Sequence, residues 1–167
     1  MLRVAISGVA GRMGNVLVQA VSAAEDLVLG AAFENHKNPA IGKDLGEVVG
    51  LARLGVTVSD SPQKKIDDFD LVIDFSVPEA TLSLSRICRE HDKAMVIGTT
   101  GFDSGQLEKL RECSEGIPIF ISPNMSLGVN ILFKLVAEAA AVFGQEVDYE
   151  VLEAHHSRKI DAPSGTA

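Results

Sequence analysis

The polar stretch EAHHSRKIDAPSGTA, residues 153–167, combines groups that could transfer a proton with groups that could bind an anion. His155 and His156 suit general acid–base catalysis, because histidine titrates near neutral pH. Lys159 could hold a carboxylate or donate a proton. Ser164-Gly165-Thr166 has the composition of a helix N-terminus, where N–H groups and hydroxyls form a nest for an anion. The segment therefore predicts a small anionic substrate, such as a dicarboxylate.

Two other interpretations of this segment stay open. A charged loop at the protein surface has the same composition and binds nothing. A zinc site is a weaker alternative, because no cysteine or third histidine lies close in the sequence. No metal is therefore predicted. If the segment continues a strand, His155 and His156 point to opposite faces and have different tasks.

A second chemical signal is the glycine-rich stretch GVAGRMG, residues 8–14. It follows an apolar run and opens a helical pattern, and small residues there let the backbone approach a pyrophosphate at a helix N-terminus. Ala10 takes the place of the second glycine of the usual dinucleotide fingerprint, and Arg12 adds a cation. A tight turn without a ligand is the alternative. The predicted cofactor-binding residues are Gly8, Val9, Ala10, Gly11, Arg12 and Met13.

Glu34 lies about 20 residues beyond the glycines, where a carboxylate can accept hydrogen bonds from both ribose hydroxyls. A carboxylate in this place favours NADH, because it repels a 2′-phosphate. His36, Lys37 and Arg12 are near enough in sequence to pair with such a phosphate. NADH and NADPH both remain candidate cofactors.

Further polar residues stand where other predicted strands end. Gly98, Thr99 and Thr100 could bring their backbone close to a flat ring. Asn124, in the stretch SPNM, could orient a carboxamide group. An ordinary loop is the alternative for both segments, but a ring-binding role is favoured where a nucleotide loop is already present.

The elements that must position these residues are short apolar strands alternating with helices. Apolar strands that alternate with helices predict an α/β fold with a doubly wound parallel sheet, whose ligands bind beyond the carboxyl ends of the strands. Residues 128–143 then read as a long apolar helix, and 147–156 alternate like a strand with one wet face. We therefore expect a Rossmann-like domain over 1–127 and the beginning of an α+β domain over 128–167. The strands are expected at 2–7, 27–33, 55–60, 70–76, 93–101 and 116–122.

Composition excludes several classes of function. The net charge of -8 argues against nucleic acid as the main partner. No apolar run approaches the length that spans a membrane, and the N-terminus lacks the pattern of a signal peptide. Cys88 and Cys113 form no motif, which favours a reducing, cytoplasmic setting.

Five stretches together resemble the 4-hydroxy-tetrahydrodipicolinate reductase (dihydrodipicolinate reductase) family: VAISGVAGRMG, DFSVPEAT, MVIGTTGF, NMSLGVN and EAHHSRKIDAPSGTA. The last is highly specific to that family. The resemblance implies reduction of a cyclic dicarboxylate imine to tetrahydrodipicolinate by NADH or NADPH, in lysine and diaminopimelate biosynthesis. It also implies a homotetramer in the cytoplasm.

Matched motif by motif, the resemblance gives His155 the family's acid–base role and makes Lys159 its proton donor. It places His156, Gly165 and Thr166 on substrate-binding positions, beside Ser164 of the predicted nest. Asn35 stands where many relatives carry arginine, so the resemblance does not decide between NADPH and NADH. The cofactor positions it implies are residues 8–13, Glu34, residues 98–100, Ser122, Pro123, Asn124 and Met125.

Relatives continue for roughly another hundred residues, more than the minimum for one small domain. The segment 128–167 is therefore expected to be the start of a larger substrate-binding and tetramerisation domain. A protein that did end at Ala167 would be expected to bind a dinucleotide without catalysing the reduction.

Overall fold

The structure is a computed structural model that describes residues 1–155 and 163–166. It divides into two compact units, Met1–Ile121 and Ser122–Ala167. The predicted domain division after residue 127 stays a prediction, because a compact unit is not by itself an independently folding domain.

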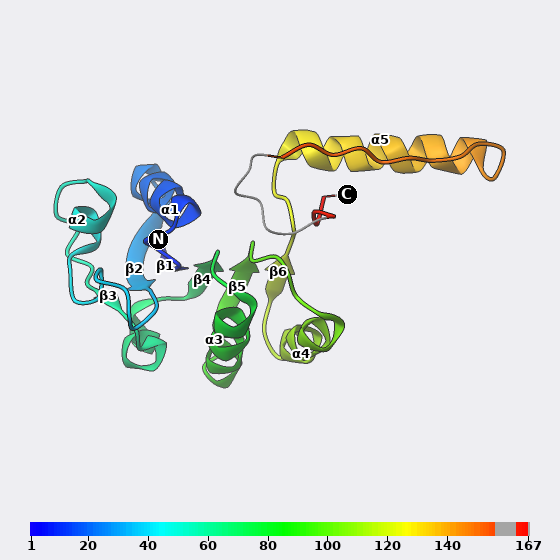
Figure 1. The fold of residues 1–167 in the computed structure, drawn as a ribbon. Coiled ribbons are helices and arrows are strands. Elements are labelled where there is room, and N and C mark those ends of the chain that lie inside the picture. The colour runs from blue at the N-terminus through cyan, green and yellow to red at the C-terminus, as the bar shows by residue number, and fades with distance from the viewer. Residues whose placement is uncertain (156–162, 167) are drawn as a thin grey trace. The chain divides into compact units, whose positions relative to one another are not determined.

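The first unit is built on a six-stranded parallel sheet with the strand order β3-β2-β1-β4-β5-β6 (Figure 1). The order runs outward from β1 in both directions, so the chain reverses its direction across the sheet between β1 and β4. This arrangement confirms the predicted doubly wound fold. The strands are β1 (Leu2–Ser7), β2 (Leu27–Phe33), β3 (Val58–Ser59), β4 (Leu71–Asp74), β5 (Ala94–Ile97) and β6 (Ile119–Ile121).

Helices cover both faces of the sheet, and alternate residues of each strand face them. Val4 and Ile6 of β1 belong to an apolar cluster that includes residues of α1 and α2, whereas Ala5 packs in a second cluster with residues of α3 and α4. In Figure 1 the pair α1 and α2 accordingly lies on the side of the sheet opposite α3 and α4. The helices of this unit are α1 (Arg12–Ala23), α2 (Leu45–Val49), the 3₁₀ helix η1 (Pro62–Asp68), α3 (Pro78–Glu90) and α4 (Ser104–Ser114).

Local signals explain where several helices begin. Pro78 is the first residue of α3, where its missing N–H costs nothing. Asp103 caps α4 and forms a reciprocal capping box with Gln106. Asp44 caps α2 and also accepts hydrogen bonds from the backbone of Leu54 and Gly55. In contrast, α1 begins after Gly11 and has no side-chain cap.

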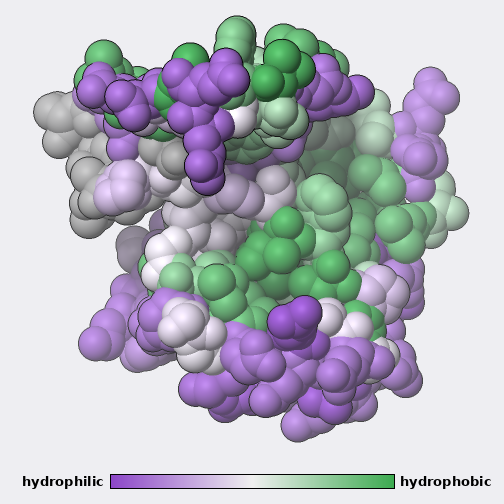
Figure 2. All heavy atoms as spheres, turned by 90° about the vertical axis from the view of Figure 1, so that its right-hand side faces the viewer, coloured by the Kyte–Doolittle hydropathy of each residue, from purple (hydrophilic) through white to green (hydrophobic). Residues whose placement is uncertain are grey.

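The sheet ends at β6, whose Phe120 and Ile121 are exposed. Apolar side chains gather in the middle of the face that contains this edge (Figure 2). Within the described residues, no helix is long and apolar enough to cross a membrane.

The second unit contains the helix α5 (Leu127–Phe143), which has no buried residue. The prediction of a strand at 147–156 is wrong for the described residues 147–155, which form no strand. A strand needs a neighbour for its N–H and C=O groups, and this segment has none within the described part of the unit. Instead, the Tyr149 hydroxyl lies 2.9 Å from the carbonyl oxygen of Gly144, just past the end of α5.

Candidate functional site

A cleft of about 660 Å³ opens at the carboxyl ends of the strands in the first unit. It lies where the strand order reverses between β1 and β4, the place where doubly wound sheets bind ligands. The glycine loop after β1, Glu34 after β2, and Phe75 and Ser76 after β4 all line it. The fold therefore brings together three segments that are far apart in the sequence.

Three glycines let the loop fold tightly against its neighbours. Gly8 has a φ of 80°, and a Cβ there would lie 2.5 Å from the carbonyl oxygen of Phe75. A Cβ at Gly14 would lie 2.3 Å from the carbonyl oxygen of Gly8. Gly11 donates its N–H to the same oxygen at 3.0 Å. The loop thus closes on itself and on the end of β4 at distances that exclude side chains.

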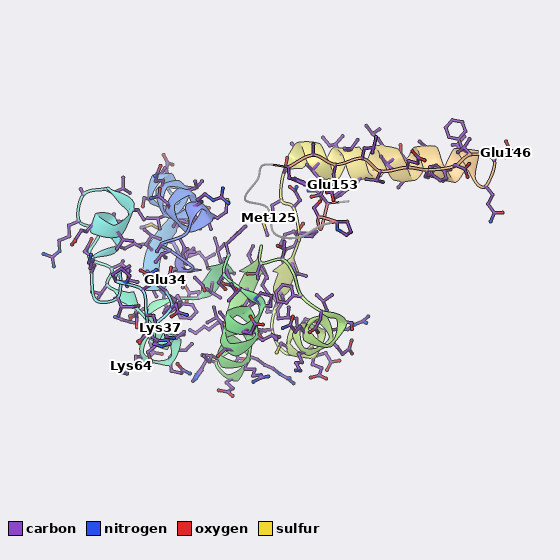
Figure 3. All side chains as sticks on the ribbon, in the orientation of Figure 1. Glu34, Lys37, Lys64, Met125, Glu146 and Glu153 are labelled. Atoms are coloured by element: carbon purple, nitrogen blue, oxygen red, sulfur yellow. The ribbon has the colours of Figure 1, made fainter. Side chains whose placement is uncertain are left out.

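Glu34 lies directly against this loop. Its Oε2 accepts a hydrogen bond of 2.9 Å from the Ala10 N–H, and its Oε1 accepts one from the Asn35 N–H. Figure 3 shows Glu34 near the end of β2, with Lys37 and Lys64 on neighbouring segments of the same unit. The Glu34 carboxylate thus accepts a hydrogen bond from the N–H of Ala10, a residue that lines the cleft. A ligand phosphate would compete with Glu34 for this N–H group.

The other predicted residues of the glycine loop differ in exposure. The Val9 side chain is fully buried, so only its backbone could reach a cofactor. Arg12 and Met13 form the first turn of α1 and are exposed, but they do not line the cleft. Their role in binding stays a prediction.

The segment after β5 supports the cleft from behind rather than lining it. A Cβ at Gly98 would lie 2.1 Å from the ring of Phe75, so this glycine lets the ring pack against the strand. Thr99 is buried, whereas Thr100 is exposed. The predicted contact of residues 98–100 with a cofactor ring stays a prediction.

In the second unit, predicted cofactor and substrate residues lie together. The Asn124 side-chain amide donates a hydrogen bond of 3.2 Å to the Thr166 hydroxyl. A Cβ at Gly165 would lie 3.0 Å from the side chain of Pro123. Ser122 donates its hydroxyl to the Asn124 carbonyl, and Met125 is exposed (Figure 3). The segment that follows the sheet therefore contacts the end of the polar stretch.

Glu153 is a functional candidate to which the sequence reasoning assigned no role. Its Oε2 lies 2.7 Å from His155 Nε2 and accepts a hydrogen bond of 2.6 Å from the Ser164 hydroxyl. Its Oε1 accepts a hydrogen bond from the Ser164 N–H. The Ser164 hydroxyl, together with His155, lowers the pKa of Glu153 to about 2. Only the folded chain could show these contacts of Glu153, because Ser164 is distant in the sequence.

His156 and Lys159 lie outside the described residues, so their predicted roles stay predictions. Among the described residues, no group of three or more histidine, cysteine or acidic side chains could hold a metal ion.

The strand order and the glycine loop define the class of the Rossmann-type, nucleotide-binding α/β proteins. The family model described as "Dihydrodipicolinate reductase, N-terminus" matches residues 2–125, and "Dihydrodipicolinate reductase, C-terminus" matches 128–167. The chain therefore belongs to the dihydrodipicolinate reductase family, and its cofactor is a nicotinamide dinucleotide.

Among solved structures, the chain is similar to the dipicolinate-bound dihydrodipicolinate reductase from Paenisporosarcina sp. TG-14, with 32% identity and a TM-score of 0.77. The match covers 99% of this chain and 62% of that one, so this chain spans less than two thirds of its relative.

More distant similarities concern the fold alone. The WlbA dehydrogenase from Chromobacterium violaceum, in complex with NADH and UDP-GlcNAcA, has 18% identity and a TM-score of 0.65, over 86% of this chain and 41% of that one. The NADP-bound aspartate semialdehyde dehydrogenase from Candida albicans has 12% identity and a TM-score of 0.58, over 86% and 48% of the two chains.

Proposed function

We propose that this protein reduces 4-hydroxy-tetrahydrodipicolinate to tetrahydrodipicolinate with NADH or NADPH, as a step of lysine and diaminopimelate biosynthesis. The observation that carries the proposal is the succession of both family models along one chain, with the dinucleotide cleft in the first. Assembly into a homotetramer in the cytoplasm is part of the same proposal.

The residues of the cleft fit a dinucleotide. The first turn of α1 has no side-chain cap, so its N–H groups are available to a pyrophosphate. Gly11, just before this turn, has no side chain to block the approach. Glu34 would leave the Ala10 N–H to a phosphate oxygen and accept hydrogen bonds from the ribose hydroxyls instead. Phe75 and Ser76 would flank the other half of the ligand.

The second unit would supply the proton and the anion site. The 4-hydroxyl group of the substrate must leave as water, which gives a conjugated imine. NADH or NADPH supplies the hydride when it is bound, and the enamine that results must gain a proton at carbon. Because Glu153 has its pKa near 2, it is ionised and can only accept hydrogen bonds. His155 therefore donates from Nε2 to Glu153, and its Nδ1 is left to exchange a proton with the substrate.

The substrate carboxylates would bind to Lys159 and to the nest formed by Ser164, Gly165 and Thr166. His156 would contact the substrate beside them. A cation and a set of N–H and O–H donors together stabilise a bound dicarboxylate.

The alternative is a nucleotide-binding module without catalytic activity. Two measurements separate the proposals: NADH fluorescence titration with and without pyridine-2,6-dicarboxylate, and steady-state NADH oxidation with freshly generated substrate. We expect the dicarboxylate to bind to the protein–NADH complex and the protein to oxidise NADH. Dinucleotide binding without any response to the dicarboxylate would support the module and overturn the reductase.

A further inference from the structure

Asp74, the last residue of β4, is a charged group that none of the roles above uses. Its side chain is completely buried beside the cleft, although the neighbouring Phe75 and Ser76 line that cleft. Burying a carboxylate is costly unless hydrogen bonds offset the lost hydration. The contacts of Asp74 therefore deserve a functional explanation.

A chain of hydrogen bonds connects Asp74 to the wall of the cleft. The Thr81 hydroxyl donates to Asp74 Oδ2 at 2.5 Å. The hydroxyl oxygens of Thr81 and Thr99 lie 3.1 Å apart, and the Ser76 N–H donates to Thr99 Oγ1 at 3.0 Å.

The Asp74 carboxylate sets the direction in which each of these hydrogen bonds is donated. A hydroxyl has a single proton, and the proton of Thr81 is taken by Asp74. Thr99 must then direct its own proton toward Thr81 or toward Asp74 Oδ2, which is 3.5 Å away. Its lone pairs are left to accept the Ser76 N–H. The position of Asp74 as an acceptor therefore orients the donors of Thr81, Thr99 and Ser76 inward.

These contacts join three segments that shape one side of the cleft. Asp74 and Ser76 belong to the end of β4, Thr81 to the first turn of α3, and Thr99 to the loop after β5. The Asp74 carbonyl also accepts the Gly98 N–H at 2.9 Å. Gly98 in turn leaves room for the Phe75 ring.

The hydrogen bonds of Asp74 differ from those expected of a residue that only stabilises the fold. Its Oδ1 is buried and has no hydrogen-bond partner within the described residues. A buried acceptor without a partner destabilises a fold. A neutral residue of the same shape would avoid part of that cost.

We propose that Asp74, acting through Thr81 and Thr99, is a positioning residue for the nicotinamide half of the cofactor site. The inference rests on the proposed dinucleotide binding. Glu34 after β2 would take the ribose on the adenine side, and the pyrophosphate would lie on α1, so the second half of the ligand must extend toward β4 and β5. That is the side on which Asp74 fixes Phe75 and Ser76.

The test compares NADH with ADP-ribose, which lacks the nicotinamide ring. Thr81→Val keeps the shape of the side chain and removes the hydroxyl, while Asp74→Asn removes the charge. We expect both variants to bind NADH roughly five- to tenfold more weakly, the size of one lost hydrogen bond. Their affinity for ADP-ribose should stay within about twofold of that of the wild type, well under the effect of one hydrogen bond.

Two controls separate positioning from packing. Thr81→Ser restores the hydroxyl and should restore the affinity for NADH. Ser85→Ala removes another buried hydroxyl of α3, one that donates to the Leu82 carbonyl away from the cleft, and should change neither affinity. Thermal melting of each variant reports the effect on folding separately.

Equal losses of NADH and ADP-ribose affinity in Thr81→Val would overturn the inference, because they would indicate a general disturbance of the fold. Unchanged NADH affinity in both Thr81→Val and Asp74→Asn would also overturn it. A failure of Thr81→Val to fold, with Asp74→Asn binding NADH normally, would assign the hydroxyl a structural role only. If the wild-type chain itself does not bind NADH, the proposed function fails instead.

Discussion

Gly14 offers a sharp test of how closely the glycine loop approaches α1. In Gly14→Ala the new Cβ would meet three backbone atoms: the Gly8 carbonyl oxygen at 2.3 Å, and the Val9 Cα and carbonyl carbon at 2.6 and 2.8 Å. None of these atoms belongs to a flexible side chain that could turn away. The loop and the helix must therefore move apart by about 1 Å to reach ordinary contact distances.

The size of the effect follows from two opposing contributions. Forcing an extra methyl group into a packed site typically costs about 1–3 kcal/mol. Replacing glycine by alanine within a helix returns up to about 1 kcal/mol. Because all three close atoms belong to the backbone, the cost lies near the upper end of this range. We therefore expect a net loss of about 1–2 kcal/mol, which corresponds to a melting temperature lower by roughly 3–8 °C for a unit of this size. Because the loop is displaced, NADH should bind at least about tenfold more weakly.

The assays are thermal melting and NADH fluorescence titration. Gly105→Ala is a matched control, because Gly105 is an exposed residue in the first turn of α4. Its Cβ would lie 3.4 Å from Asp103 Oδ1, an ordinary contact, so stability and NADH affinity should not fall. A Gly14→Ala protein with wild-type stability and wild-type NADH affinity would refute the reasoning about the close approach.

Three further predictions concern charged groups. Glu34→Ala should weaken NADH binding more than NADPH binding, since only NADH keeps the free 2′-hydroxyl, and equal losses in a titration would count against Glu34 as the ribose ligand. Glu153→Gln should lower kcat more than it raises KM and should alter the pH profile, because the carboxylate holds the ring of His155; an unchanged profile would contradict this. Hydrogen bonds from Arg3 lower the pKa of Asp70 from 3.8 to about 2. The wild type should therefore be more stable than Asp70→Asn at neutral pH, and urea titrations should show this difference shrink as the pH falls from about 4 to about 2; a constant difference would exclude the ion pair as its cause.

The sequence by itself determined the sheet and the position of the glycine loop. Apolar runs such as LVLGAAF and DLVIDFS report burial on both faces directly, because a parallel strand covered by helices must be apolar along its whole length. The glycines of residues 8–14 and the acid at Glu34 are also local signals, since their spacing reflects the length of one strand–helix–strand unit. These expectations agree with the strand order and with the residues that line the cleft.

Only the tertiary structure decided which side chains meet. Asp74, Thr81 and Thr99 come from three segments, and no periodic pattern in the sequence predicts that their side-chain oxygen atoms form one buried series of hydrogen bonds. Glu153 and Ser164 likewise form a hydrogen bond although they lie 11 positions apart in the sequence. The same limitation explains why the strand predicted at 147–156 is wrong for residues 147–155. An alternating pattern indicates that a segment is suited to a sheet, but not that a neighbouring strand is present. Hydrophobic patterns are properties of a segment, whereas hydrogen-bond partners are properties of the folded chain.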